Sequence, residues 1–423
     1  MIFRPAESSK RIVEFYRNYL LSAFQTNNEE YNKQFEEQLL KSEIIAKGPY
    51  LNLSDSYLKD SSILDLIEQK ILHSDFAKLK SLHPNRKLYK HQVDAIVRVV
   101  EEKNIVVSSG TGSGKTECFL IPIINHLLKQ KADGALTPGI RALMIYPMNA
   151  LVNDQIFRLR QILQDVPDLT FGRYTGETKE TYKDALNEYR SRERSDPLPN
   201  ELISREQMRK TPPHILITNY AMLEYLLLRP DDHVFFNPPY NHHWKYIVLD
   251  EAHSYHGAKG IEVSMLLRRV NARLSGIKTR YILTSATLGE KEDNSRVVQF
   301  ASSLCSASFF EEEVIRSERY IPVATDKIVQ NELSLFTKLA QDIRDHSPRE
   351  DLIKTIKEFS SVSIDETLSA EEILYYLILH DGFYYKLRHV LSTPKTLEES
   401  SRLLEVLLSI EMYTTKLTKE CTT

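Results

Sequence analysis

Short apolar runs recur along the middle of the chain, and each is followed by a stretch with helical periodicity. The runs are rich in Val, Ile and Leu and are centred near residues 105, 143, 171, 216, 247 and 282. Runs of this length without alternating polar positions are typical of strands that are buried on both faces. Strands that alternate with helices connect by right-handed crossovers into a parallel sheet. The pattern therefore predicts an α/β fold.

The two ends of the chain have apolar residues at helical spacing and few strand signals. We therefore expect three segments: a helical region over residues 1–84, an α/β domain over residues 85–322 and a helical domain over residues 323–423. The break Gly48-Pro49-Tyr50 interrupts the first of them. Residues 387–404 faintly resemble a helix-turn-helix, but a plain helical bundle is favoured because the turn lacks glycine.

The composition is that of a globular protein, and it points to no strongly acidic or basic partner. Of the 423 residues, 42% are apolar and 27% are charged, and the net charge is −3. Any surface that attracts nucleic acid must therefore be a local basic groove. The isolated cysteines Cys118, Cys305 and Cys421 argue against a zinc site or a disulfide framework and fit a reducing cytoplasm. No run of about 18 apolar residues is present, so we expect no membrane span.

A glycine-rich turn follows the first apolar run. Its residues are Gly110, Thr111, Gly112, Ser113, Gly114, Lys115 and Thr116, and an apolar helix comes after them. The glycines allow backbone N–H groups to converge on an anion, and a helix N-terminus favours negative charge. In such a loop Lys115 reaches the β- and γ-phosphates of a nucleotide, and the Thr116 hydroxyl binds Mg²⁺. The strict pattern begins with glycine where this chain has Ser109, a small residue that also fits.

Two carboxylates follow the fifth apolar run. Asp250 and Glu251 come directly after residues 245–249, at the edge where open parallel sheets bind ligands. Asp250 is a candidate ligand of Mg²⁺ through water, and Glu251 is the candidate base that orients and deprotonates the attacking water. An Asp-Glu pair alone is usually a solvated strand end. Together with the phosphate loop, the pair predicts hydrolysis of ATP with Mg²⁺.

Seven short segments resemble, in order, the motifs of the first RecA-like lobe of superfamily 2 helicases of the DEAD/DEAH-box kind. They are residues 88–92 (Q motif), 109–116 (I), 146–151 (Ia), 174–177 (Ib), 218–223 (Ic), 250–253 (II) and 285–287 (III). Within the superfamily, residues 217–230 and 250–260 resemble the MrfA/YprA-type DNA helicases and their relatives in bacterial defence systems. The resemblance implies a RecA-like P-loop sheet, with ATP and Mg²⁺ as cofactors. It also implies DNA rather than RNA as the track, and it fits both DNA repair and antiviral defence.

The resemblance implies further roles for single residues. Gln92 would contact the adenine edge, and His253, Ser285 and Thr287 would couple hydrolysis to the grip on a strand. Because motifs Ia, Ib and Ic each follow a predicted strand, they share the sheet edge of the ATP site and could hold successive phosphates without reading bases. The candidates are Pro147, Asn149, Thr175, Gly176, Thr218 and Asn219. The alternative is that they are ordinary helix caps.

A charged excursion over residues 179–210 separates motif Ib from motif Ic and includes Arg190, Arg192 and Arg194. A solvated helix and loop is the favoured interpretation. The alternative is an insertion whose arginines contact phosphates of duplex DNA.

A working motor of this superfamily has a second RecA-like lobe with an arginine-rich motif that stabilises the transferring phosphate. No segment after Thr287 resembles that motif. We therefore expect the second lobe in cis or in trans, and slow or no hydrolysis by this chain alone. Two functions stay open: the N-terminal half of an ATP-dependent DNA helicase or translocase, and a nucleotide-gated DNA-binding or scaffold subunit of a larger complex. The complete set Lys115, Thr116, Asp250 and Glu251 favours the first.

Overall fold

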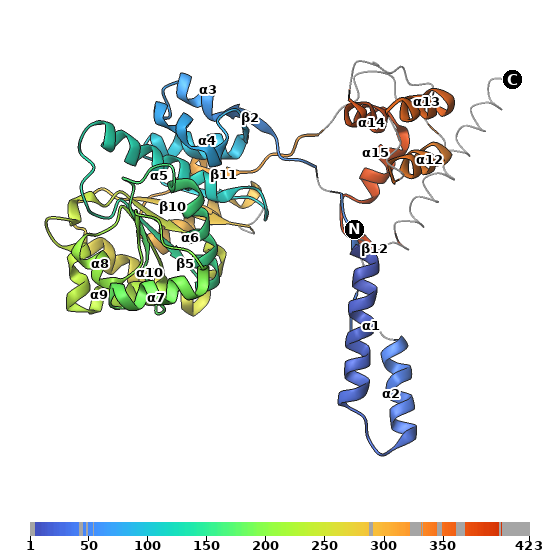
Figure 1. The fold of residues 1–423 in the computed structure, drawn as a ribbon, viewed down its shortest axis with the longest axis horizontal. Helices are drawn as coiled ribbons and strands as arrows, with labels where there is room; N and C mark the ends of the chain where they lie inside the picture. Colours follow the sequence, from blue (N-terminus) through green and yellow to red (C-terminus); the bar gives the residue numbers. More distant parts are fainter. Residues whose placement is uncertain are drawn as a thin grey trace. The chain divides into compact units, whose positions relative to one another are not determined.

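The chain forms two compact units. The sheet unit is Ser56–Tyr320, and the split unit combines Met1–Asp55 with Ile321–Thr423. The structure, a computed structural model shown in Figure 1, describes residues 5–41, 45–47, 50–53, 55–286, 291–321, 331, 333–344, 349–360, 369–396 and 399.

Eight parallel strands form the centre of the sheet unit, in the order β11-β4-β10-β9-β5-β8-β6-β7. They are β4 (Ile105–Ser108), β5 (Ala142–Tyr146), β6 (Phe171–Arg173), β7 (Glu201–Leu202), β8 (Ile215–Asn219), β9 (Tyr246–Leu249), β10 (Arg280–Ser285) and β11 (Val314–Arg316). The six apolar runs of the sequence are six of these strands, which confirms the predicted α/β class. The other two leave no apolar run, because β7 has only two residues and β11 lies between charged neighbours.

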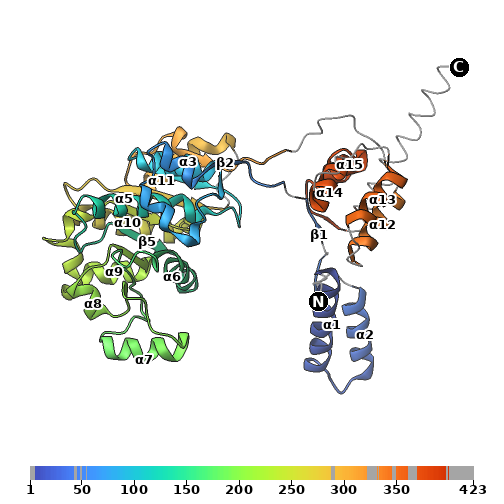
Figure 2. The same ribbon diagram turned by 45° about the horizontal axis from the view of Figure 1, so that its top comes forward.

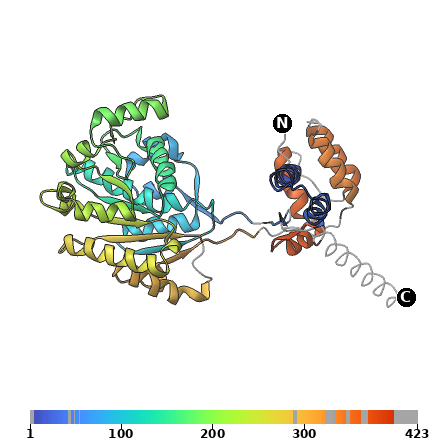
Figure 3. The same ribbon diagram turned by 90° about the horizontal axis from the view of Figure 1, so that it is seen from below.

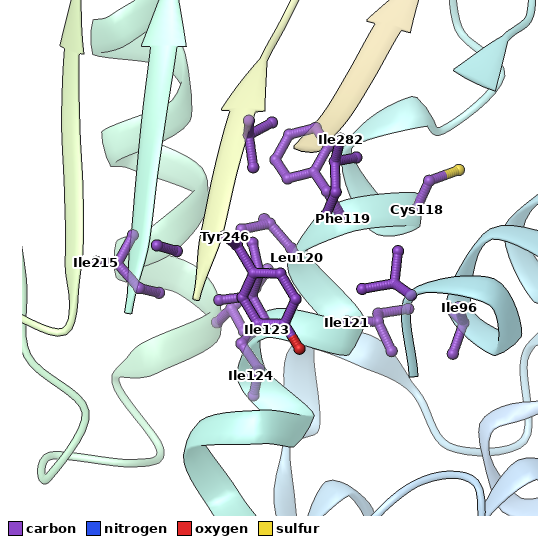
Figure 4. Packing of buried hydrophobic residues seen from close by; sticks show 14 of the residues in the cluster. Ile96, Cys118, Phe119, Leu120, Ile121, Ile123, Ile124, Ile215, Tyr246 and Ile282 are labelled. Carbon is purple, nitrogen blue, oxygen red and sulfur yellow. The ribbon is translucent and has the colours of Figure 1, made fainter. Parts of the chain in front are cut away.

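Helices cover both faces of this sheet (Figure 2, Figure 3). One face carries α4 (Lys90–Val100), α5 (Lys115–Ala132) and α6 (Asn149–Leu163), and the other carries α9 (Tyr220–Leu228), α10 (Gly257–Arg273) and α11 (Asn294–Cys305). On the first face, Phe119 and Ile123 of α5 pack with Tyr246 of β9 and Ile282 of β10 (Figure 4). Because each strand is buried on both sides, its residues are apolar in succession rather than in alternation. This is the RecA-like α/β architecture that the motifs imply.

The remaining elements of the sheet unit lie in its connections. They are β2 (Lys59–Ser62), α3 (Ile63–Glu68), η1 (Ser74–Lys78), η2 (Lys80–Leu82), β3 (Lys87–Tyr89), α7 (Tyr182–Glu193), α8 (Arg205–Lys210), η3 (Pro230–Phe236), η4 (Asn241–His243), η5 (Ala252–Ser254), η6 (Lys291–Asp293) and η7 (Glu311–Glu313), where η marks a 3₁₀ helix. The short strands β2 and β3 pair antiparallel.

Both ends of the chain build the split unit. Its elements are α1 (Pro5–Ala23), α2 (Glu29–Lys41), β1 (Tyr50–Leu51), α12 (Leu333–Arg344), α13 (Arg349–Phe359), α14 (Ala370–Leu379), α15 (Gly382–Val390) and β12 (Lys395–Thr396). Strand β1 pairs antiparallel with β12, and Arg388 donates a 2.7 Å hydrogen bond to Asp55. The core of α12, α13 and α14 includes Leu335, Ile356 and Leu377.

The boundary expected at residue 84 differs from the structure. Ile63, Leu66 and Phe76 belong to the core of the sheet unit, so residues 56–84 are part of that unit. Their short helices complete too few turns to show which residues face a core. The two regions expected to be all-helical also contribute the strands β1 and β12. The second half of the helix-turn-helix candidate lies outside the described residues, apart from β12 and Glu399.

Buried cysteines behave as small apolar residues in the sheet unit. Cys118 and Cys305 are fully buried, and burial raises the pKa of both thiols. Cys421 lies outside the described residues. In the part of the chain that the structure describes, no cluster of three His, Cys, Asp or Glu side chains could hold a metal. No described helix is both long enough and apolar enough to cross a membrane.

Candidate nucleotide site and nucleic-acid edge

The phosphate loop connects the carboxyl end of β4 to the first residue of α5. Gly112 and Gly114 have φ angles of +72° and +74°, which favour glycine, and Gly114 directly precedes α5. The hydroxyls of Ser109 and Ser113 lie 2.6 Å apart and close the loop from inside. Lys115 Nζ donates to the carbonyls of Ser109 (3.0 Å) and Gly110 (3.3 Å). The ammonium group is therefore held over the loop, where it can transfer its hydrogen bonds to a phosphate.

Gln92 lies behind the loop rather than open to a base. Its Oε1 accepts from the backbone N–H of Tyr89 at 2.8 Å, and its Nε2 donates to the carbonyl of Gly114 at 2.9 Å. The side chain is fully buried. The structure thus differs from the expectation that Gln92 contacts adenine, because both ends of its amide are engaged within the protein. Here the residue braces the loop.

Asp250 follows β9 and lies between the strands on either side of it. Its backbone N–H donates to Ile145 of β5 at 3.1 Å, and its Oδ1 accepts from the Thr284 hydroxyl of β10 and from the Glu251 N–H at 3.0 Å. Burial raises the pKa of Asp250; the Thr284 hydrogen bond and the positive charge of Lys115 act against that shift. Lys115 and Asp250 thus follow β4 and β9, two strands of one parallel sheet that are separated by β10.

Glu251 and His253 bring motif II to motif III. Glu251 has a φ of +50°, a conformation that non-glycine residues rarely adopt. Its buried Oε2 atom lies 3.3 Å from His253 Nδ1 but forms no hydrogen bond with a described residue. His253 Nδ1 also lies 3.1 Å from the hydroxyl of Ser285. A chain of contacts thus runs from the candidate base to the end of β10; Thr287 lies outside the described residues.

Motifs Ia, Ib and Ic meet at the carboxyl ends of β5, β6 and β8. Asn219 caps α9 by accepting from the Met222 N–H at 2.7 Å, and its Nδ2 donates to Asn149 Oδ1 at 2.7 Å. Asn149 Nδ2 in turn donates to Glu177 at 3.2 Å. Pro147 is half-buried and Gly176 is exposed at the same edge. We call Asn149, Asn219, Pro147 and Gly176 the nucleic-acid edge, after their predicted role. Asn219 is a helix cap, and contact of this edge with nucleic acid stays a prediction.

Two of the predicted edge residues point inward. Thr175 and Thr218 are fully buried. The Thr218 hydroxyl donates to the carbonyl of Tyr174 at 2.7 Å, and the Thr175 hydroxyl is buried with no partner among the described residues. Neither hydroxyl reaches solvent, so the expectation that they grip phosphates is not met in this structure. Thr218 is a residue of β8, where side chains alternate between the two covered faces.

Comparison with known proteins places this site in a family. Residues 89–295 match the DEAD/DEAH box helicases. These residues form a DEAD/DEAH box helicase domain. The chain is similar to the Druantia protein DruE of Escherichia coli, with 30% identity over 406 residues, 74% of this chain and 22% of the relative. It is also similar to the uncharacterized ATP-dependent helicase YprA of Bacillus subtilis, with 29% identity over 216 residues, 49% of this chain and 24% of the relative.

The chain thus spans about a quarter of the length of these relatives. Among solved structures it is similar to the helicase MrfA bound to DNA, with 22% identity and a TM-score of 0.46, over 63% of this chain and 32% of that one. It is also similar to the DEAD-box helicase Mss116 bound to ssRNA and UDP-BeF, with 19% identity and a TM-score of 0.47, over 73% of this chain and 55% of that one.

The helicase domain contains site residues that the sequence motifs did not indicate. Thr284 holds Asp250 from the neighbouring strand, and its place one residue before motif III could have marked it, since β9 and β10 run in register there. Glu117, one residue after the loop, forms an ion pair with Arg158 at 2.5 Å. No local sequence pattern predicts the contact between Glu117 and Arg158, because Glu117 lies in α5 and Arg158 lies in α6.

The charged excursion extends the sheet of the helicase domain. Arg190 pairs with Asp196 at 2.6 Å, and Arg192 pairs with Glu193 at 3.0 Å. Arg194 ends α7 in a left-handed conformation. Beyond this helix, β7 adds an edge strand to β6. Helix α7 and its loop fit the favoured interpretation of a solvated surface; contact of these arginines with DNA stays a prediction.

Proposed function

We propose that this chain is the ATP-binding half of an ATP-dependent helicase or translocase that acts on nucleic acid, with DNA favoured over RNA. The observation that carries the proposal is the convergence of Lys115, Asp250 and Glu251 at the carboxyl ends of β4 and β9. A structural sheet edge has no need of a buried carboxylate beside a phosphate loop, because burying charge is costly. The preference for DNA rests on the resemblance of residues 217–230 and 250–260 to the MrfA/YprA-type helicases.

The residues present fit a bound Mg²⁺. Magnesium prefers oxygen ligands and keeps several waters. The Asp250 carboxylate and the Thr116 hydroxyl would hold it, and the buried Glu251 Oε2 lacks a hydrogen bond that a water could supply. When bound, Mg²⁺ neutralises charge on the β- and γ-phosphates. Lys115 would hold the same phosphates, while Glu251 would orient the attacking water and accept its proton.

His253 and Ser285 support coupling of this chemistry to the nucleic-acid edge. They connect Glu251 to the end of β10, so a change at the γ-phosphate can move the ends of neighbouring strands. We further propose that a second RecA-like lobe, in cis or in trans, supplies the arginine for fast turnover. At the edge, Asn149, Asn219, Pro147 and Gly176 would hold the backbone of one strand.

Steady-state hydrolysis of ATP tests the proposal. The full chain is compared with Lys115→Ala, Glu251→Gln and the surface control Lys183→Ala, each with and without single-stranded DNA and single-stranded RNA. Turnover that rises with DNA and disappears in Lys115→Ala would support a motor, and Glu251→Gln should lower turnover by about 10²- to 10⁴-fold while keeping ATP bound. ATP binding without turnover would support the nucleotide-gated scaffold subunit. If the unaltered chain does not bind ATP, both proposed functions are refuted.

A further inference from the structure

The guanidinium group of an exposed arginine lies over the ring of a buried tyrosine beside the phosphate loop. The guanidinium carbon of Arg319 is 3.7 Å from the ring centroid of Tyr57, and Arg319 Nη2 donates to the Tyr57 hydroxyl at 3.1 Å. Arg319 is exposed, whereas Tyr57 is only 7% exposed. A guanidinium is planar and stacks on aromatic faces. The guanidinium group therefore covers Tyr57, although Arg319 as a whole is an exposed residue.

Backbone pairing and packed rings fix the position of this arginine. Tyr57 and Arg319 form an antiparallel bridge. On either side, the Leu58 N–H donates to Glu318 at 2.9 Å and the Tyr320 N–H donates to Ser56 at 2.8 Å. The Tyr57 ring packs against the rings of Tyr89 and His91, at centroid distances of 5.3 and 5.4 Å. The tyrosine thus gives Arg319 a rigid support.

The same tyrosine contacts the phosphate loop. A Cβ atom added to Gly110 would lie 2.9 Å from the Tyr57 hydroxyl and 3.9 Å from Arg319 Nη2. His91 Nε2 lies 2.9 Å from the carbonyl of Ser113, so the cluster touches the loop at two points. Arg319 therefore lies within reach of a nucleotide whose phosphates occupy the loop.

The order of the strands says which end of the nucleotide faces Arg319. Asp250 follows β9, which is separated from β4 by β10 on one side, and Arg319 follows β11, which borders β4 on the other side. A nucleotide whose γ-phosphate points toward Asp250 extends its base away from β9. That direction leads to the side of the loop where Arg319 lies.

We propose that Arg319, supported by Tyr57, is the platform on which the base of the bound nucleotide stacks. We also propose that the site accepts ATP and GTP with little discrimination. The inference rests on the proposed function. Stacking tolerates any base because every base has a π-face. Discrimination needs a hydrogen-bond partner for the base edge, and the Gln92 amide is already engaged at both ends by Tyr89 and Gly114.

Equilibrium binding of unlabelled ligands, measured by calorimetry on the full chain, tests this platform. The ligands are ATP, GTP and inorganic tripolyphosphate, and the variants are Arg319→Ala and Arg319→Lys. Arg296→Ala is the matched control, because Arg296 is an exposed arginine of the same unit that pairs with Asp293 at 3.4 Å. We expect dissociation constants for ATP and GTP within about threefold of each other in the unaltered chain. Both should rise about tenfold or more in Arg319→Ala, since stacking on a protein side chain contributes roughly that factor.

Binding of tripolyphosphate, which has no base, distinguishes base stacking from a purely structural role of Arg319. Its affinity should stay unchanged in Arg319→Ala, and Arg319→Lys should not restore ATP binding because lysine keeps the charge without the plane. An equal loss of tripolyphosphate binding, restoration by lysine, or a strong ATP preference that Gln92→Ala removes would each overturn the platform. If the unaltered chain binds neither tripolyphosphate nor ATP, the proposed function fails as well, and the two failures are thereby distinguished.

Discussion

Adding one methyl group at Gly114 tests whether Gln92 braces the phosphate loop. A Cβ at Gly114 would overlap the Gln92 Nε2 atom and lie 3.1 Å from Glu117 Oε2, whereas a Cβ at Gly112 would meet no atom within 4 Å. The two glycines have nearly the same φ, +74° and +72°. Gly112→Ala is therefore a matched control, because it carries the same backbone strain without the contact.

The expected difference follows from the contacts of Gln92. An L-residue in the left-handed conformation costs roughly 1–2 kcal/mol, and both variants carry this cost. An amide at the end of a flexible side chain would usually move aside cheaply. This one is fully buried and holds Tyr89 and Gly114. Breaking two buried hydrogen bonds adds roughly 2–6 kcal/mol, at about 1–3 kcal/mol each.

Urea unfolding followed by tryptophan fluorescence measures this difference. Trp244 is the only tryptophan in the chain and is 2% exposed in the sheet unit, so its emission reports the unfolding of that unit alone. Gly114→Ala should lower the free energy of unfolding by at least about 2 kcal/mol more than Gly112→Ala does. In a Gln92→Ala background the added cost of Gly114→Ala should shrink to the strain of roughly 1–2 kcal/mol. Equal losses in the two single variants would refute the brace.

Two further predictions concern buried charge. Asp250→Asn should abolish hydrolysis yet raise the melting temperature at neutral pH. Folding raises the pKa of Asp250, so at a pH above that pKa the buried carboxylate is charged and destabilises the folded state. Each kcal/mol gained is roughly 2–4 °C; the gain should shrink as pH falls through that pKa, and a lower melting temperature at neutral pH would contradict the assignment. Arg160→Ala should cost about 3–5 kcal/mol in urea unfolding, because it strands Glu201, a side chain only 5% exposed. Arg190→Ala, in an exposed pair with Asp196, should cost under about 1 kcal/mol; equal effects would show that burial does not set these energies.

The sequence was most informative where the chemistry is contiguous along the chain. The phosphate loop, Asp250 and Glu251 are local patterns that follow apolar strands, and the structure places them after β4 and β9 of one parallel sheet. Their joint role in hydrolysis stays a prediction. Side-chain direction was harder to predict. Thr175 and Thr218 look like surface caps in the sequence but are buried. Thr218 is the penultimate residue of β8, a strand that helices cover on both faces.

Contacts between distant segments could not be predicted from one sequence. Tyr57 and Arg319 lie 262 residues apart and carry no shared motif. The case of Gln92 is different. Its motif is recognisable in the sequence, but its hydrogen-bond partners depend on how α4 packs against the phosphate loop. The strand β7 has only two residues, and β11 has three, between Glu313 and charged residues that follow it, so neither leaves an apolar run in the sequence.

The division of the chain into two units sets the order in which its parts can fold during synthesis. The sheet unit begins at Ser56 and ends at Tyr320, and these two residues are hydrogen-bonded to each other at 2.8 Å. It is thus an insertion within the split unit, with its ends side by side, an arrangement that suits an independently folding domain. On the ribosome the sheet unit is complete once Tyr320 has emerged and can fold at that point. Residues 50–53 and Asp55, in contrast, must wait for their partners Arg388, Leu391 and β12. They are therefore made before the sheet unit but reach their folded contacts after it.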